Sequence, residues 1–179
     1  MDDMDGLAFE DLKVGNFWKS EGREIQSCDI IEFAELTGDK DPLHTDPTFA
    51  AKTPFGEPIA HGLLGLSFMA GLSSNCPRVQ TIAFVGIHDW QFVRPIFVGD
   101  TIHVETEVVA LVDHGRRHGK VVWQRRVVNQ KGQVVQQGNL TTLVTRRSLP
   151  VRRIDQSHST TNLSHLSTAT GALPGHSRQ

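Results

Sequence analysis

A short polar loop holds the residues best suited to acid–base chemistry. The stretch TGDKDPLHTDPTFA, residues 37–50, places Asp39 and His44 five positions apart, and Pro42 and Pro47 restrict the backbone around them. A carboxylate and an imidazole on such a loop can face one cleft, where they can activate a water molecule and move its protons near neutral pH. Considered alone, however, the loop is more typical of capped, hydrogen-bonded backbone than of a catalytic site.

The sequence PIAHGLLG, residues 58–65, offers a group that could stabilise negative charge. Gly62 falls near the start of an apolar helix, where the first N–H groups have no acceptor within the helix and the positive end of the helix dipole points outward. An oxyanion can bind there, and a glycine lets it approach the backbone closely. The alternative role for Gly62 is close packing. We expect His61 to anchor the start of the helix by hydrogen bonding, with catalysis as its alternative role.

Helices are expected to position these residues. The stretch DIIEFAELTG predicts a helix that Ser27 or Asp29 caps and that Gly38 ends. HGLLGLSFMAGL, which begins at His61, predicts an apolar helix that is buried on all sides. Because a glycine costs a helix about 1 kcal/mol relative to alanine, the glycines of this helix predict a close approach to a sheet. They are Gly62, Gly65 and Gly71.

Residues 79–147 predict antiparallel strands. IHVETEV alternates apolar and polar residues, and KVVWQRRVV and NLTTLVT are rich in β-branched residues. NQKGQ and FVGD contain glycine-bearing turns. Since one apolar helix precedes these strands, the simplest packing is a curved sheet wrapped around that helix, which is an α+β fold. Trp90, Phe92 and Trp123 are expected in the core or at a dimer contact, with the wall of an acyl tunnel as an alternative.

Composition narrows the classes of protein. The chain has 179 residues and a formal net charge of −2, which suits one globular domain and gives no general electrostatic case for binding nucleic acid or an acidic membrane. Cys28 and Cys76 are far apart and form no CxxC, so neither a disulfide framework nor a zinc site is expected. The sequence has neither a signal-peptide pattern nor an apolar run of membrane-spanning length, so the expected location is the cytoplasm.

The two ends of the chain differ from the middle. Residues 148–179 include the uncharged, Ser/Thr-rich run SHSTTNLSHLSTAT, which buries too little apolar surface to offset its ordering entropy. We therefore predict a folded domain over residues 1–147 and a flexible tail over 148–179. The tail histidines are expected to be solvated rather than to bind a metal, and they are His158, His165 and His176. Acidic residues at the start predict a solvated end, and they are Asp2, Asp3, Asp5, Glu10 and Asp11.

Two neighbouring stretches, FAELTGDKDPLHTDPTFA and FGEPIAHGLLGLSFMAGL, resemble the MaoC-like family, the (R)-specific enoyl-CoA hydratases that are also called hydratase 2. WQFVRPIFVGDTIHVETEV is similar to the strand segment that follows in that family, so the resemblance covers residues 8–147. It implies a single hot-dog fold, an antiparallel sheet wrapped around a central helix, in a homodimer or a dimer of dimers. It also implies an acyl-CoA thioester as substrate, a place in fatty acid metabolism, and neither a cofactor nor a metal.

The resemblance also implies roles for individual residues. The catalytic pair falls on Asp39 and His44, and the oxyanion N–H falls on Gly62. Further candidates for contact with the substrate are Asp41, His61 and Arg94.

Two positions depart from the family pattern. Asp41 stands where the family usually has asparagine, and capping of a turn is the favoured role for it. Ala70 stands where some relatives have serine, so a polar contact to the substrate is expected to be missing. Other arginines are candidates for binding CoA phosphates, with a solvated strand face as an equal alternative, and they are Arg116, Arg117, Arg125, Arg146 and Arg147.

The loop and its resemblance together favour hydration of a trans-2-enoyl thioester, or the reverse dehydration. Asp39 and His44 would hold and activate the water, and the Gly62 N–H would stabilise the enolate that forms. One alternative is a hot-dog thioesterase, which needs the same kinds of group. A second is a non-catalytic subunit that binds acyl thioesters, an alternative that Asp41 and Ala70 leave open.

Overall fold

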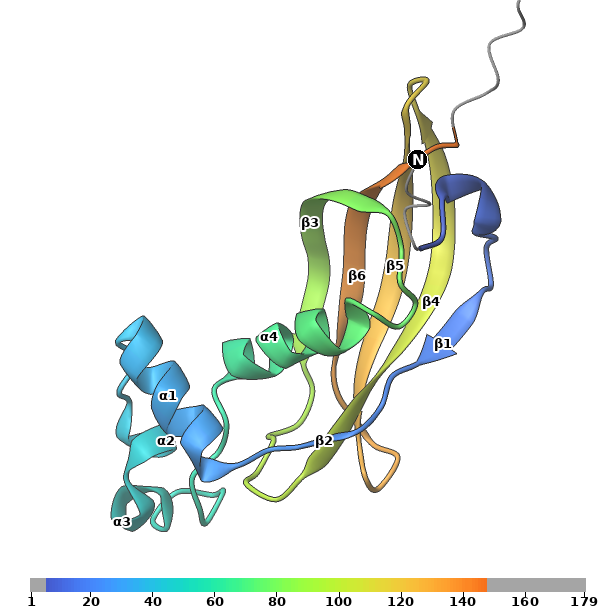
Figure 1. The fold of residues 1–179 in the computed structure, drawn as a ribbon. Coiled ribbons are helices and arrows are strands. Elements are labelled where there is room, and N and C mark those ends of the chain that lie inside the picture. Colours follow the sequence, from blue (N-terminus) through green and yellow to red (C-terminus); the bar gives the residue numbers. More distant parts are fainter. Residues whose placement is uncertain (1–5, 148–179) are drawn as a thin grey trace, which may run out of the picture. The chain divides into compact units, whose positions relative to one another are not determined.

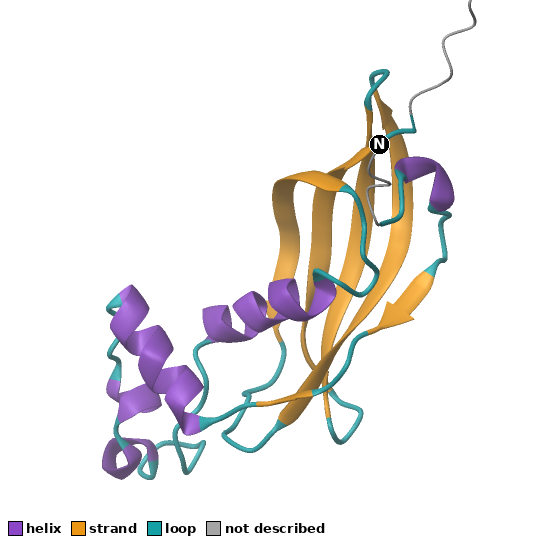
Figure 2. Cartoon of the chain, viewed as in Figure 1, coloured by secondary structure: helices purple, strands orange, loops and turns teal. Residues whose placement is uncertain are grey.

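Six strands form one antiparallel sheet, and helix α4 lies against one of its faces (Figures 1 and 2). The computed structural model describes residues 6–147, so the predicted tail and the first acidic residues lie outside the described residues. The strands are β1 (Phe17–Lys19), β2 (Arg23–Glu24), β3 (Thr81–Phe92), β4 (Thr101–His114), β5 (His118–Asn129) and β6 (Val134–Thr145). The helices are the 3-10 helix η1 (Phe9–Asp11), α1 (Ser27–Thr37), α2 (Pro42–Thr45), α3 (Pro47–Ala50) and α4 (Gly62–Ser73). This is the α+β hot-dog arrangement that the sequence predicts.

Alternation along the strands gives the sheet one buried face. The strand order is β1-β4-β5-β6-β3, and β2 also pairs with β4. Every second residue of β4 from Ile102 to Val108 is buried, because successive side chains of a strand point to opposite faces. The register sets Val108 opposite Trp123 on β5, and Trp123 opposite Leu140 on β6. These three side chains are almost fully buried, so the core lies on this face of the sheet.

Helix α4 is buried on one side only. Leu64 and Met69 are buried, whereas Leu63 is 59% exposed and Ala70 is also exposed. The prediction that this helix is buried on all sides is therefore wrong for the single chain, because one sheet covers only one side of it. Neither α4 nor any other helix among residues 6–147 has the length and apolar character needed to cross a membrane.

The glycines of α4 have different surroundings. A Cβ atom at Gly65 would collide with Nε2 of Gln136, and a Cβ atom at Gly62 would lie 2.9 Å from the ring of Phe92. Nothing lies within 4 Å of the corresponding position at Gly71. The prediction of close approach is therefore confirmed for Gly65 and Gly62 and wrong for Gly71.

Helix α1 begins and ends through local hydrogen bonds. Its N-cap is Gln26, whose backbone N–H donates to the carboxylate of Asp29 at 2.8 Å. Asp29, and not Ser27, therefore satisfies this end of the helix. Gly38 follows the last helical residue with φ of 79°, the left-handed conformation that a glycine adopts without strain, and it ends the helix as predicted.

The start of the described chain is tied to the end of β6. The guanidinium of Arg147 donates to the carboxylate of Asp11 at 2.6 Å, and Arg146 lies 3.6 Å from Glu10. Asp11 is partly buried in its ion pair, so the prediction of a solvated end is wrong for it, whereas Glu10 is exposed as predicted. The two arginines are engaged in ion pairs with the protein's own acids.

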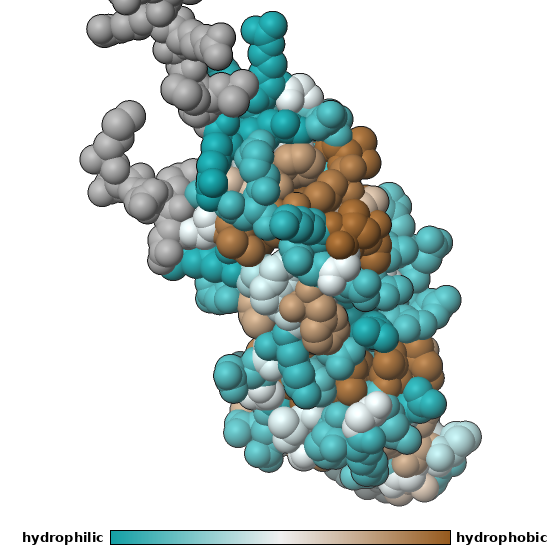
Figure 3. Space-filling model, turned by 90° about the vertical axis from the view of Figure 1, so that its right-hand side faces the viewer, coloured by the Kyte–Doolittle hydropathy of each residue, from teal (hydrophilic) through white to brown (hydrophobic). Residues whose placement is uncertain are grey.

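The two edges of the sheet differ in character. Strand β3 forms one edge, and five of its large apolar side chains are at least 40% exposed. They are Ile82, Phe84, Val85, Ile87 and Phe92. The side that carries β1 and β4 is predominantly hydrophilic, with apolar areas gathered toward the right-hand margin of the view (Figure 3).

Candidate active site

The loop that follows α1 is fixed by two capped one-turn helices. Asp41 and Asp46 each accept a hydrogen bond at 2.8 Å from the backbone N–H two residues further on, and they form the N-caps of α2 and α3. Pro42 and Pro47 are the first residues of these helices, where a missing N–H removes no helical hydrogen bond. His44 therefore sits on backbone that is held from both sides.

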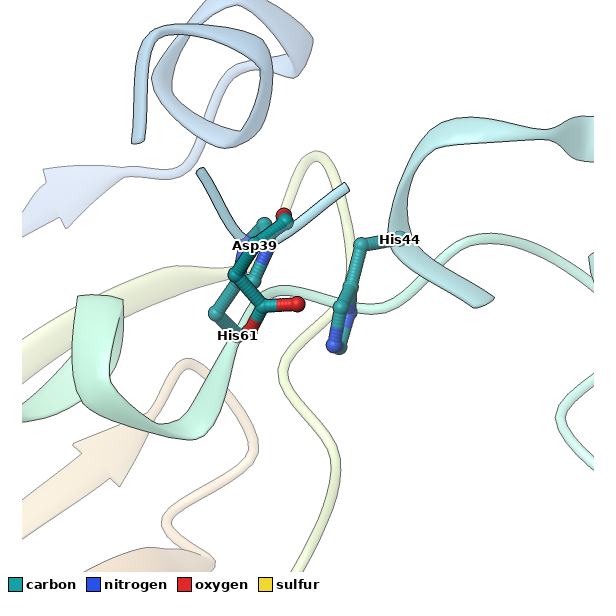
Figure 4. A group of neighbouring side chains, drawn as sticks. All are labelled: Asp39, His44 and His61. Carbon is teal, nitrogen blue, oxygen red and sulfur yellow. Dashed lines mark hydrogen bonds between the residues drawn. The ribbon is translucent and has the colours of Figure 1, made fainter. Parts of the chain in front are cut away.

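Asp39, His44 and His61 converge at one place (Figure 4). A nitrogen or oxygen atom of each side chain lies within 4.8 Å of the corresponding atoms of the other two. The carboxylate of Asp39 projects toward the imidazole of His44 (Figure 4). Asp39 is exposed, His44 is partly buried and His61 is only 2% exposed. The fold thus brings together the two residues that the sequence singles out, with His61 beside them.

Hydrogen bonds set the orientation of both histidines. Nδ1 of His44 lies 2.7 Å from the carbonyl oxygen of Ile59, and Nε2 of His61 lies 2.9 Å from the carbonyl oxygen of Asp39. Since a carbonyl only accepts, each of these nitrogens carries a proton. The ring centroids of His44 and His61 are 3.9 Å apart, and Phe33 packs on His61 at 5.1 Å. His44 therefore presents Nε2 as the nitrogen that is free to exchange a proton.

A hollow of about 460 Å³ opens beside this cluster. His44 lines it together with Gly62, the first residue of α4, whose N–H has no acceptor within the helix. The hollow therefore has an acid–base group and a candidate oxyanion donor in its wall. Asp39 is not among the lining residues and reaches the hollow only alongside His44. The remaining lining is largely apolar, and it includes Phe55, Ile59, Phe92, Val93 and Ile96.

A sequence model of the MaoC like domain family matches residues 14–131. The chain belongs to this family. The 3-hydroxybutyryl-CoA dehydratase of Methylorubrum extorquens is 40% identical over 114 residues, which are 62% of this chain and 69% of that protein. The (R)-specific enoyl-CoA hydratase of Aeromonas caviae is 36% identical over 105 residues, 59% of this chain and 77% of that protein. The solved MaoC-like dehydratase from Rhodospirillum rubrum superposes with a TM-score of 0.72 at 31% identity, covering 80% of this chain and 100% of that one.

The other residues that the sequence selects lie at different distances from the hollow of this MaoC-like chain. Arg94 lines it, and its Nη1 donates to the carbonyl oxygen of Val134 at 2.7 Å. Asp41 is an exposed cap of α2 and does not line the hollow. Ala70 and Arg125 line a second hollow toward the other end of α4. Arg125 is 9% exposed, so the alternative of a solvated strand face is wrong for it.

Gln136 of β6 is a residue of the site that the sequence does not reveal. Its Nε2 donates to the carbonyl oxygen of Gly62 at 3.0 Å, and its side chain lines the hollow. This bond holds the first turn of α4 against the sheet and thereby fixes the direction of the Gly62 N–H. A single glutamine in an alternating strand carries no sequence signal for such a contact, because its partner is 74 residues away.

The converging Asp39, His44 and His61 also offer the donor types that metals accept. The rings of His44 and His61 are stacked with only 31° between their planes. The lone pair of an imidazole nitrogen lies in the ring plane, so two rings stacked in this way direct their lone pairs side by side rather than at one point. A metal needs each nitrogen at about 2.0–2.1 Å along its lone pair. The arrangement therefore suits proton transfer better than a shared ion.

Proposed function

We propose that this MaoC-like chain adds water across the trans-2 double bond of an enoyl-CoA thioester, or removes it from the 3-hydroxyacyl thioester. The observation that carries the proposal is one largely apolar hollow that His44, with its free Nε2, and Gly62, with its N–H, both line, while the carboxylate of Asp39 lies beside His44. The names of the two relatives, a dehydratase and a hydratase of CoA thioesters, support it.

The reaction follows from these groups. A water molecule held between Asp39 and Nε2 of His44 loses a proton as its oxygen bonds to C3 of the enoyl chain. The electrons of the double bond move toward the thioester, whose oxygen becomes an enolate that accepts a hydrogen bond from the Gly62 N–H. A proton returned by the Asp39–His44 pair to C2 completes the addition. Dehydration is the same path in reverse.

The proposal extends to the working form of the protein. Its substrate is an acyl-CoA of fatty acid metabolism, its location is the cytoplasm, and its chemistry uses no cofactor because the pair supplies both the base and the acid. We propose a homodimer as the assembly, since the apolar edge strand β3 is exposed in the single chain.

The test is the loss of the conjugated enoyl-thioester absorbance when the protein is mixed with crotonyl-CoA. Asp39→Asn and His44→Ala should each lower kcat by a factor of roughly 100 to 10,000, the usual range for a general acid or base. Asp46→Asn is the matched control, because it removes a neighbouring carboxylate while asparagine still caps α3. It should keep its activity.

Two other results would replace the proposal. Release of free thiol from the thioester, with no change of the double bond, would make the protein a thioesterase. Binding of crotonyl-CoA without turnover, at an affinity that Asp39→Asn does not change, would make it an acyl-thioester-binding subunit.

A further inference from the structure

A buried positive charge lies toward the far end of α4 from the proposed catalytic residues. Arg125 of β5 is 9% exposed, and its burial lowers its pKa to about 10, so it stays protonated at neutral pH. Its Nη1 donates to the hydroxyl of Ser73 and lies 3.6 Å from the sulfur of Met69. Its Nε is buried without a partner, and among residues 6–147 no carboxylate pairs with it. A charge buried in this way is strongly destabilising unless an anion compensates it.

The arginine lines the second hollow, which has a volume of about 220 Å³. Most of the wall around it is apolar and includes Ala70, Phe84 and Trp123. The hydroxyl of Thr142, which also lines the hollow, accepts a hydrogen bond from the indole of Trp123. The hollow thus combines apolar walls with one cation that lies over the Trp123 ring and has no carboxylate partner among residues 6–147, which suits a carboxylate at the end of a hydrocarbon chain.

The same three elements form the walls of both hollows. Helix α4 contributes Gly62 to the first and Ala70 to the second, two residues on one stripe of the helix surface. Strand β3 contributes Phe92 to the first hollow and Phe84 to the second, so it runs antiparallel to α4 here. Strand β6 contributes Gln136 and then Thr142. The two hollows therefore lie toward the two ends of α4, on the side of the helix that meets β6 and β3.

The distance along α4 between the two hollows sets the length of the chain that could reach from one to the other. Ser73, which holds Arg125, lies eleven residues after Gly62, a rise of about 16 Å along the helix. A hydrogen bond between a carboxylate and the guanidinium takes up about 3 Å of this distance. An extended chain advances about 1.2 Å per bond, a third of the span of one peptide residue, so the remainder corresponds to roughly ten bonds.

We propose that the acyl chain of the substrate runs along α4 from the first hollow to the second and ends in a carboxylate bound by Arg125. The preferred substrates are then mono-CoA thioesters of α,ω-dicarboxylic acids with roughly ten carbons. A carboxylate can take hydrogen bonds from Nε and a terminal nitrogen of one guanidinium together. This inference rests on the proposed function, because it places the reacting thioester at Gly62.

The test measures affinity without turnover. The probes are sebacoyl-CoA and decanoyl-CoA, which have the same ten-carbon saturated chain and differ by the terminal carboxylate. Neither can be hydrated. Isothermal titration calorimetry at neutral pH should show at least about ten-fold tighter binding of sebacoyl-CoA, as expected for a hydrogen bond to a charged group. Succinyl-CoA and butyryl-CoA should bind alike, because a four-carbon chain does not reach the arginine.

Variants assign the preference to one side chain. Arg125→Met should abolish it, and Arg125→Lys, which keeps the charge, should retain part of it. Arg126→Met is the matched control: it removes the neighbouring arginine, which pairs with Glu105 at 3.3 Å and does not line the hollow, and it should keep the full preference.

Equal affinity for the two ten-carbon probes would overturn the inference, and so would a preference that survives in Arg125→Met or a failure of both probes to bind. These results are separable from the proposed function. A protein that hydrates crotonyl-CoA but does not distinguish the probes keeps the hydratase activity and loses the dicarboxylate preference. A protein that prefers sebacoyl-CoA but does not hydrate crotonyl-CoA keeps the dicarboxylate preference and loses the hydratase activity.

Discussion

His61 links the two proposed catalytic residues without lining the hollow. Its Nε2 donates to the backbone of Asp39, and its ring stacks on His44. Its Nδ1 is buried and has no hydrogen-bond partner. Leaving such a group unpaired costs about 1–3 kcal/mol. A buried imidazole kept at that cost is more easily explained by the position it gives Asp39 than by its contribution to stability.

Replacing His61 by phenylalanine separates these two effects. The change keeps a ring between His44 and Phe33, removes the bond to Asp39 and removes the unpaired Nδ1. We expect the free energy of unfolding to change by less than about 1 kcal/mol. The variant loses the hydrogen bond to Asp39, but it also loses the cost of burying Nδ1 without a partner, and the two effects offset each other. We expect kcat on crotonyl-CoA to fall by roughly 10- to 100-fold, because Asp39 is no longer held in place.

The two measurements are urea unfolding and steady-state kinetics. Phe33→Leu is the control, because it alters the packing on His61 and leaves the hydrogen bond to Asp39 in place. A His61→Phe protein with wild-type kcat would show that His61 is a packing residue and has no positioning role.

At the scale of elements, the approach of α4 to the sheet determines where the Gly62 N–H points. Gly65 lies against Gln136 and Ile96, and Gln136 in turn donates to the carbonyl oxygen of Gly62. The helix can come this close only because Gly65 has no side chain. One glycine therefore governs both the packing of α4 and the geometry of the proposed oxyanion site.

Alanine substitutions at two glycines of α4 should have opposite effects. Alanine favours a helix by about 1 kcal/mol over glycine, and at Gly71 nothing opposes that gain, so Gly71→Ala should raise the free energy of unfolding by up to about 1 kcal/mol. At Gly65 the new methyl group collides with Gln136, and overpacking of this kind costs typically about 1–3 kcal/mol. Gly65→Ala should therefore be less stable and less active than the wild type. Urea unfolding measures the first effect and crotonyl-CoA turnover the second, and stabilisation by both substitutions would contradict this account of the helix.

The elements that the sequence predicts well are those with a strong local signal. The alternation of β4, the turn at Gly132 and the end of α1 at Gly38 all depend on neighbouring residues, and all three are present. Strands β1 and β2 have three and two residues, too few to show any period. They form because β4 offers them a partner about 80 to 90 residues along the chain, and local pattern cannot show that.

The sequence likewise predicts one part of the candidate site and misses another. The loop around Asp39 and His44 can be recognised in the sequence by its polar residues and prolines. The bond from Gln136 to Gly62 and the burial of Arg125 depend on how the sheet meets α4. In an alternating strand, Arg125 is as consistent with a solvated face as with a buried one. Only the register, which sets it opposite the buried Thr106, places it among the buried residues.

At the scale of the whole molecule, strand β3 is an edge strand with no neighbour on its outer side among residues 6–147 of the single chain. It ends the sheet, and an edge strand presents unpaired N–H and C=O groups to any second strand. Phe84 and Phe92 on this strand are both more than half exposed, and each lines one of the two hollows. A second copy paired along β3 would therefore extend the sheet and cover the open side of both hollows.

Light scattering should accordingly give a mass about twice the 19.8 kDa of the chain. Replacing Ile82 and Val85 together by lysine places two charges on the edge, which opposes strand pairing, and should yield a single chain. Val112→Lys is the matched control, since it charges a valine of similar exposure on β4, and it should remain a dimer. If β3 is the contact, the dissociated variant should also bind decanoyl-CoA more weakly, because its hollows stay open. A wild-type protein with the mass of one chain, or a double variant that stays dimeric, would show that β3 is not the contact between subunits.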